Sequence, residues 1–161
     1  MPVIFSSAHG EICKSLEMLK IIQSGEPLSP TAFSLSVHNA IAGLFSIALK
    51  NRQEISVLAP GIEGIAPAFV EALGLLQEGA ASVLVLLYDE PIADFYPVAP
   101  FHLNGTMPCV VALLLSLDGE GVRMALDRSV QSGEIGEQPV QLLAFLKFLL
   151  TDAPALTLGS S

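Results

Sequence analysis

The sequence has 161 residues, 52% hydrophobic and 14% charged, and a net charge of -9. It therefore holds enough apolar side chains for one compact domain, and its low charge content excludes a disordered chain. The negative charge argues against electrostatic binding to nucleic acid or to an anionic membrane surface. No apolar run reaches the roughly 20 residues of a membrane span. Two cysteines are too few for a disulfide framework, which indicates a reducing cytoplasm.

The first part of the chain predicts a strand, two helices and a second strand. Residues 3–6 form a short apolar, β-branched run typical of a strand. Residues 11–23 repeat apolar side chains every three or four positions, as a helix does. Prolines in segment 27–30 hold the chain extended before the helical pattern returns over 37–50. Residues 55–59 form the next strand candidate.

The middle of the chain predicts a helix followed by two buried strands. The helix covers about 65–78, with a proline in its first turn and a glycine just beyond its end. Segments 82–88 and 109–117 are almost continuously apolar, which is typical of strands covered on both faces by helices. Between them, residues 89–107 form a long loop, and loops of this length are usually functional or interface segments.

The last part of the chain is more polar. Residues 118–137 predict a loop or hairpin, 141–150 an amphipathic helix and 155–158 a final short strand. The whole order of elements predicts an α/β layered domain around a mixed, mostly parallel sheet. The apolar surplus of the chain predicts in addition a large interface with a partner.

The strand, tight turn and helix over residues 55–78 have the layout of a nucleophile elbow, in which a reactive side chain sits at a helix N-terminus. The turn is Ala59-Pro60-Gly61-Ile62-Glu63-Gly64 and contains no Ser, Cys or Thr. Covalent acyl transfer needs such a nucleophile. Glu63 would also repel an oxyanion or a phosphate. A plain connection between strand and helix is therefore favoured over a working anion site.

Other reactive residue types are scattered. Cys13 and Cys109 are expected to be buried as small hydrophobic residues. His38 precedes a helix, so we expect a neutral, hydrogen-bonded imidazole with a structural role. His9 and His102 are expected to be solvated.

The pair Asp89-Glu90 closes a strand and is expected to be a solvated strand end. No group of His, Cys, Asp and Glu has the spacing of a metal site, so we expect neither a metal nor a cofactor.

Three segments together resemble a known family. The helix with the pattern Asn-x-x-Ala-Gly, here in Ser36–Ser46, looks like the corresponding helix of β-ketoacyl synthases. Segment 55–64 looks like the strand and elbow that carry their active-site cysteine, and 78–85 resembles the strand entry that follows. The string Glu-Pro-Leu-Ser-Pro-Thr-Ala-Phe-Ser-Leu-Ser-Val-His-Asn-Ala-Ile-Ala-Gly is most similar to the chain length factors of aryl-polyene gene clusters.

This resemblance covers residues 3 to about 117 and implies half of a thiolase-like fold. It implies one β-ketoacyl synthase-like N-terminal domain over 1–161, with a core of about 3–117 and a C-terminal extension over 118–161. The family's nucleophilic cysteine falls on Gly61. Its two catalytic histidines belong to a second half that this chain does not contain, and its first strand would precede Val3.

The resemblance thus implies a non-catalytic subunit that forms a heterodimer with an active ketosynthase and shapes its acyl tunnel by volume. Acyl carrier protein is itself acidic, so we expect it to bind through that partner. The residues expected at the interface or the tunnel are Phe33, His38, Asn39, Gly43, Phe45, Val57, Ala59, Gly61 and Ile62. Two alternatives remain open: a condensing enzyme that uses Cys13 or Cys109, and a degenerate homodimer with a purely structural role.

Overall fold

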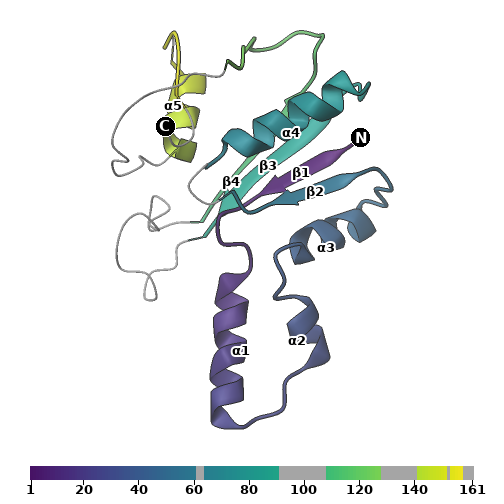
Figure 1. The fold of residues 1–161 in the computed structure, drawn as a ribbon, viewed down its shortest axis with the longest axis vertical. Helices are drawn as coiled ribbons and strands as arrows, with labels where there is room; N and C mark the ends of the chain where they lie inside the picture. Colours follow the sequence, from purple (N-terminus) through teal and green to yellow (C-terminus); the bar gives the residue numbers. More distant parts are fainter. Residues whose placement is uncertain (61–63, 91–107, 128–140, 152, 158–161) are drawn as a thin grey trace.

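The computed structural model of the chain describes residues 1–60, 64–90, 108–127, 141–151 and 153–157. Within these ranges, a four-stranded sheet has the order β2-β1-β3-β4 (Figure 1). The strands are β1 (Val3–Ser6), β2 (Ile55–Leu58), β3 (Val83–Asp89) and β4 (Cys109–Leu115). β1 lies parallel to both β2 and β3, while β4 runs antiparallel to β3. The expected mixed, mostly parallel sheet is confirmed.

Helices connect the parallel strands, because a parallel pair needs a long crossover. The connecting helices are α1 (Ile12–Ser24), α2 (Pro30–Ser34), α3 (Ala40–Ala48) and α4 (Ala66–Gln77), and a fifth helix, α5 (Gln141–Leu149), follows β4. Four of these five were expected, and the largest shift is at the start of α3, which was predicted at residue 37. The short α2 was not predicted. Ser29 caps it by accepting a hydrogen bond from the backbone N–H of Ala32 at 3.4 Å.

One face of the sheet packs against α4 and α5. The rings of Phe69 on α4 and Phe145 on α5 lie with centroids 5.0 Å apart over this face. The buried strand residues beneath them are Ile4, Val83, Val85 and Leu87. The helix predicted in the C-terminal extension therefore packs on the main core, because Phe145 is among its buried residues.

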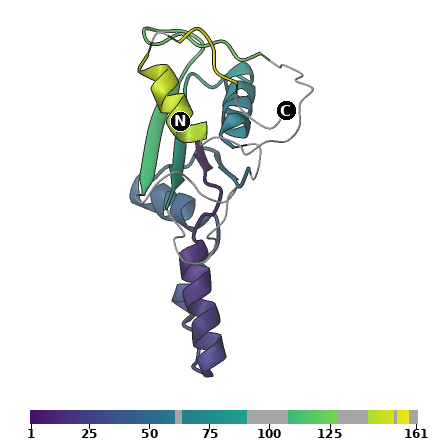
Figure 2. The same ribbon diagram turned by 90° about the vertical axis from the view of Figure 1, so that its left-hand side faces the viewer.

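The opposite face of the sheet packs against α3, and Figure 2 shows α3 and α4 on opposite sides of the sheet. Phe5 of β1 meets Phe45 of α3 edge to face, with ring centroids 5.3 Å apart. Helices thus lie on both faces, as expected.

α3 leaves the outer face of β4 open. Val110 is 68% exposed and Leu114 is 64% exposed. The prediction that this apolar strand is covered on both faces is therefore wrong for the described part of the chain. The side chains that alternate with these two, at 111, 113 and 115, pack on the α4 face.

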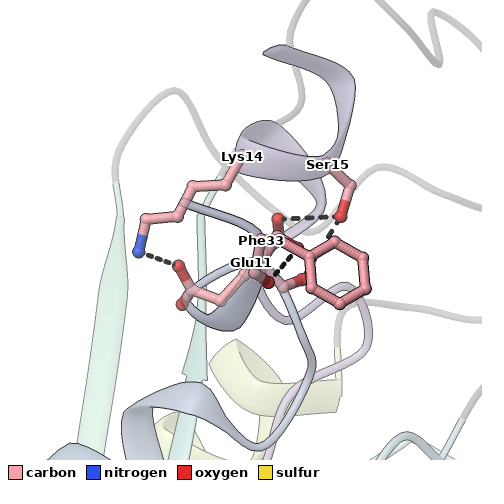
Figure 3. A network of polar contacts seen from close by, with 5 residues as sticks. Glu11, Lys14, Ser15 and Phe33 are labelled. Carbon is pink, nitrogen blue, oxygen red and sulfur yellow. Dashed lines mark hydrogen bonds and ion pairs between the residues drawn. The ribbon is translucent and has the colours of Figure 1, made fainter. Parts of the chain in front are cut away.

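α1 and α2 form an arm that extends away from the sheet (Figures 1 and 2). No residue of either helix is buried. A hydrogen bond joins the base of the arm to the segment that follows α2, and an ion pair lies within the base itself. The hydroxyl of Ser15 donates to the carbonyl oxygen of Ser36 at 3.3 Å, and Lys14 forms an ion pair with Glu11 (Figure 3).

Two expectations about the rest of the chain can be compared with the structure. Residues 118–127 form neither helix nor strand, in agreement with the loop predicted over 118–137, and residues 128–137 lie outside the described part; the strand predicted to reach residue 117 ends at Leu115. Residues 155–157 form no strand either, so the prediction of a final strand is wrong there, and Leu158 lies outside the described residues. Most of the predicted long loop, residues 91–107, also lies outside them.

Candidate functional site

The three parallel strands end at the same edge of the sheet, and Ser7 joins their ends. Ser7 directly follows β1 and is 2% exposed. Its backbone N–H donates to the carbonyl oxygen of Leu58 at the end of β2, at 3.2 Å. Its hydroxyl donates to the carboxylate of Asp89 at the end of β3, at 2.7 Å. The same hydroxyl accepts a hydrogen bond from the backbone N–H of Gly10 at 2.7 Å.

The carboxylate of Asp89 lies in the turn that precedes α1. Besides the Ser7 hydroxyl, it accepts hydrogen bonds from the backbone N–H groups of Ala8, at 3.1 Å, and His9, at 3.4 Å. Burial raises the pKa of Asp89 above its usual value of 3.8, and these hydrogen bonds offset part of that rise. Backbone N–H groups ahead of a helix are a typical anion site. Here the chain's own carboxylate occupies these donors.

His38 closes the other side of this cluster. Its Nε2 lies 3.1 Å from the carbonyl oxygen of Leu58. A carbonyl oxygen can only accept, so Nε2 carries the proton and donates. The imidazole lies against Gly10, whose φ is +53°, and a Cβ atom on Gly10 would fall 2.3 Å from Nδ1 of His38. The prediction of a hydrogen-bonded His38 is confirmed.

Two polar residues that were expected to be solvated are partly buried. The carboxylate of Asp89 accepts hydrogen bonds from three donors. Nδ1 of His9 is buried and has no hydrogen-bond partner among the described residues. Those predictions are wrong because the turn after β1 folds back over the end of β3, a contact between residues about eighty positions apart in sequence. Glu90 is exposed, as expected. His102 lies outside the described residues.

The predicted interface residues fall into two groups. Val57 and Phe45 pack together in the core between β2 and α3, both partly buried. Asn39 and Gly43 are exposed on the first turns of α3, and the Asn39 side chain makes no capping hydrogen bond.

The remaining interface candidates lie on the arm or after β2. Phe33, on α2, is 59% exposed. Ala59 is exposed directly after β2. Gly61 and Ile62 lie outside the described residues. The structure therefore places Phe45 and Val57 in one hydrophobic cluster and His38 on the carbonyl oxygen of Leu58, the residue after Val57, and leaves Phe33 exposed on the arm.

Neither cysteine lies between β2 and α4, where the sequence predicts the layout of a nucleophile elbow. Cys13 lies on α1, and Cys109 begins β4. Both are partly exposed, so the expectation of full burial is wrong. Desolvation raises the pKa of the Cys13 thiol above its usual value of 9.0, and the neighbouring Glu90 carboxylate raises it further. A thiol becomes reactive when its pKa falls, so Cys13 is a poor nucleophile.

The described part of the chain holds no group of three or more His, Cys, Asp or Glu side chains arranged for a metal ion. It also contains no helix with the length and hydropathy needed to cross a membrane.

The family of the chain follows from a match to a sequence family described as "Beta-ketoacyl synthase, N-terminal domain", which covers residues 1–160. The chain belongs to this family. The resemblance predicted from the segments around Asn39 and Ala59 is confirmed by this match. No protein among those with curated functions matches the chain.

Among solved structures, this ketosynthase-like chain is similar to a chain of a ketosynthase (ApeO) in complex with its chain length factor (ApeC) from Xenorhabdus doucetiae. The two sequences are 32% identical, and the TM-score is 0.65. The match covers 71% of this chain and 48% of the other, so this chain spans about half the length of the solved one. The expected thiolase-like half with a mixed sheet is confirmed.

The sequence did not predict the cluster of Ser7, Gly10, His38 and Asp89 at the ends of the strands. Its one local signal was the segment Ser7-Ala8-His9-Gly10 between an apolar strand and a helix, a turn with small residues where a strand meets a helix N-terminus. Asp89 carried no such signal, because its partners are distant in sequence.

Proposed function

We propose that this chain is a non-catalytic, ketosynthase-like subunit, a chain length factor, that pairs with an active β-ketoacyl synthase and bounds its acyl tunnel. The observation that carries the proposal is the sequence of the segment after β2, where a family of acyl-transfer proteins would hold its nucleophile and this chain has Gly61. The similarity to a chain from a ketosynthase in complex with its chain length factor supports the pairing.

The exposed apolar side chains support a partner role. β2 lies at an edge of the described sheet, so one row of its backbone N–H and C=O groups has no neighbouring strand. On α3, Ile47 is 75% exposed, and Leu44 is also exposed beside Gly43. A contiguous apolar patch on a protein surface often marks an interface with another protein. In the proposed heteromer, β2 lies against its counterpart in the ketosynthase across a two-fold-like interface.

The finer parts of the proposal follow from the same resemblance. The subunit limits product length through the volume that Phe33, Phe45 and the residues after β2 leave for the acyl chain, which needs shape and no nucleophile. The elongated products are polyene or fatty-acid-type chains made in the cytoplasm. Acyl carrier protein docks on the ketosynthase, because the net charge of -9 on this chain repels an acidic carrier.

Co-expression with the cognate ketosynthase tests the pairing. With an affinity tag on this chain only, we expect both proteins to co-purify, and light scattering during gel filtration to give the mass of a heterodimer. The same chain expressed alone is expected to be poorly soluble. A well-behaved homodimer that captures no ketosynthase would contradict the proposal and favour the structural homodimer.

The two cysteines of this chain allow a test of the alternative, in which the chain is itself a condensing enzyme. The double variant Cys13→Ala, Cys109→Ala removes every thiol of this chain. We expect the complex containing it to elongate acyl chains at the rate of the wild-type complex, because the thioester forms on the ketosynthase. An acyl adduct on this chain in an intact-mass spectrum, or loss of elongation in the double variant, would favour the alternative.

A further inference from the structure

Leu58 is the last residue of β2, and its carbonyl oxygen accepts two hydrogen bonds. One comes from the backbone N–H of Ser7 at 3.2 Å, and the other from Nε2 of His38 at 3.1 Å. The first is a continuation of the parallel pairing between β1 and β2. The second comes from outside the sheet, since His38 lies between α2 and α3.

This second bond matters because β2 is an edge strand. Its backbone pairs with β1 alone among the described strands, so nothing in the sheet holds it from the other side. His38 therefore ties the end of β2 to the start of α3, the helix that carries Asn39 and Gly43. This hydrogen bond joins two of the proposed interface elements, in addition to the packing of Phe45 and Val57 in the core between them.

The imidazole is itself held in place. It lies against the bare Cα of Gly10, at a position where a Cβ would be 2.3 Å from Nδ1. Gly10 is held in turn by its N–H bond to the hydroxyl of Ser7, which donates to Asp89. We call Ser7, Gly10, His38 and Asp89, with the carbonyl of Leu58, the strand-end clamp. It joins the ends of β1, β2 and β3 to the start of α3.

We propose that His38 is a positioning residue: its Nε2–H group fixes the end of β2, through the Leu58 carbonyl, in the place that the partner ketosynthase recognises. The proposal rests on the proposed function for the identity of the partner. His38 acts here from inside its own chain, and Ala59 and Pro60, which directly follow the held carbonyl, are the residues whose position it sets.

Two amide variants separate hydrogen bonding from ring packing. In His38→Gln, the side-chain nitrogen lies about as far from the backbone as Nε2 of histidine and can still donate to Leu58. In His38→Asn, the nitrogen corresponds to Nδ1 and falls short of that carbonyl. Val37→Ala changes the exposed neighbour of His38 and serves as the control.

The first readout does not depend on the affinity for the partner. Hydrogen exchange followed by mass spectrometry reports the backbone protection of segment 55–60 in the chain as purified, alone or in its complex. We expect His38→Asn to accelerate exchange there by about tenfold, since losing one hydrogen bond to a partly buried carbonyl has an effect of this size. His38→Gln and Val37→Ala are expected to exchange like the wild type.

The second readout is affinity for the ketosynthase, measured at a temperature where each variant is folded by circular dichroism. We expect His38→Asn to weaken binding about tenfold and His38→Gln to stay within about threefold of the wild type. Equal affinity of the wild type and His38→Asn would overturn the proposal. So would equal losses in both variants, because that result would assign the effect to the ring and not to its N–H group.

Folding failure and failure of the proposed function give different results. If His38→Asn does not fold, His38→Gln alone decides: wild-type protection and affinity support the proposal, and loss of either overturns it. If the wild-type chain binds no ketosynthase, the proposed function and the recognition part of the inference fail together. The exchange readout then still tells whether His38 holds the end of β2.

Discussion

Gly10 is a residue at which a side chain would not fit. Its φ of +53° is in the left-handed region, and the His38 ring occupies the place of a Cβ. Gly25 offers a matched comparison. It has a φ of +77° at the end of α1, with nothing within 4 Å of an added Cβ. The two positions share the backbone conformation and differ in the neighbour.

We therefore expect Gly10→Ala to destabilise the chain more than Gly25→Ala. The left-handed conformation alone costs an alanine about 1–2 kcal/mol. At Gly10, overpacking against His38 adds about 1–3 kcal/mol. Urea unfolding followed by circular dichroism measures both variants against the wild type. Equal midpoints for the two variants would mean that the His38 ring moves away at no cost, and the clamp would not be rigid.

The sequence alone predicts that a nucleophile is absent, but it does not predict which residues form the cluster at the strand ends. The absence of a nucleophile between Ala59 and Gly64 can be predicted from the residue types of this short segment alone. The contact between Ser7 and Asp89 joins residues 82 positions apart. Local periodicity contains no information on such a pair, so Asp89 was expected to face water. For His38 the prediction was incomplete. Its position ahead of a helix predicted a hydrogen bond, but it did not predict that the acceptor is the carbonyl oxygen of Leu58.

At the scale of elements, the sequence predicted most helices and strands because their apolar spacing is strong, as in β3 and α4. The sequence does not predict α2, because prolines in segment 27–30 favour an extended chain, whereas Pro30 lies in the first turn of this helix, where a proline is well tolerated. The open outer face of β4 could not be predicted. An apolar run shows that a strand is hydrophobic on both sides, but it does not show which side finds a neighbour within the same chain.

Gly43 on α3 gives a test of the proposed interface at this scale. Glycine in an exposed helix is destabilising unless something needs the space, and an added Cβ on Gly43 meets nothing within 4 Å. Gly74 on α4 is equally exposed and equally open. Replacing either glycine by alanine is expected to stabilise the chain by about 0.5–1 kcal/mol.

The two variants should differ in the complex. If the ketosynthase backbone approaches α3 closely, Gly43→Ala weakens the heterodimer while Gly74→Ala leaves it unchanged. Thermal unfolding measures the first effect, and titration of the ketosynthase by isothermal calorimetry measures the second. Similar affinities for both variants would remove Gly43 from the interface, whatever their stabilities.

At the scale of the whole molecule, the charge and the apolar surface point to the forces that hold the complex. The chain has seven basic residues against sixteen acidic ones, and the faces proposed to meet the partner are apolar: Phe33 on the arm, Ile47 on α3 and the edge strand β2. Burial of apolar surface is nearly independent of salt, whereas attraction between exposed charges is screened by it.

We therefore expect the affinity of this chain for its ketosynthase to change by less than about threefold when the salt concentration rises from about 0.1 M to about 1 M, although the Debye length falls from about 10 Å to about 3 Å. The binding heat capacity should be negative, because apolar surface leaves water on association. Isothermal calorimetry at several temperatures and salt concentrations measures both quantities. A loss of affinity by orders of magnitude at high salt, with a heat capacity change near zero, would instead indicate an interface built on the acidic side chains of this chain and basic side chains of the ketosynthase. The apolar faces of α3 and β2 would then lie outside it.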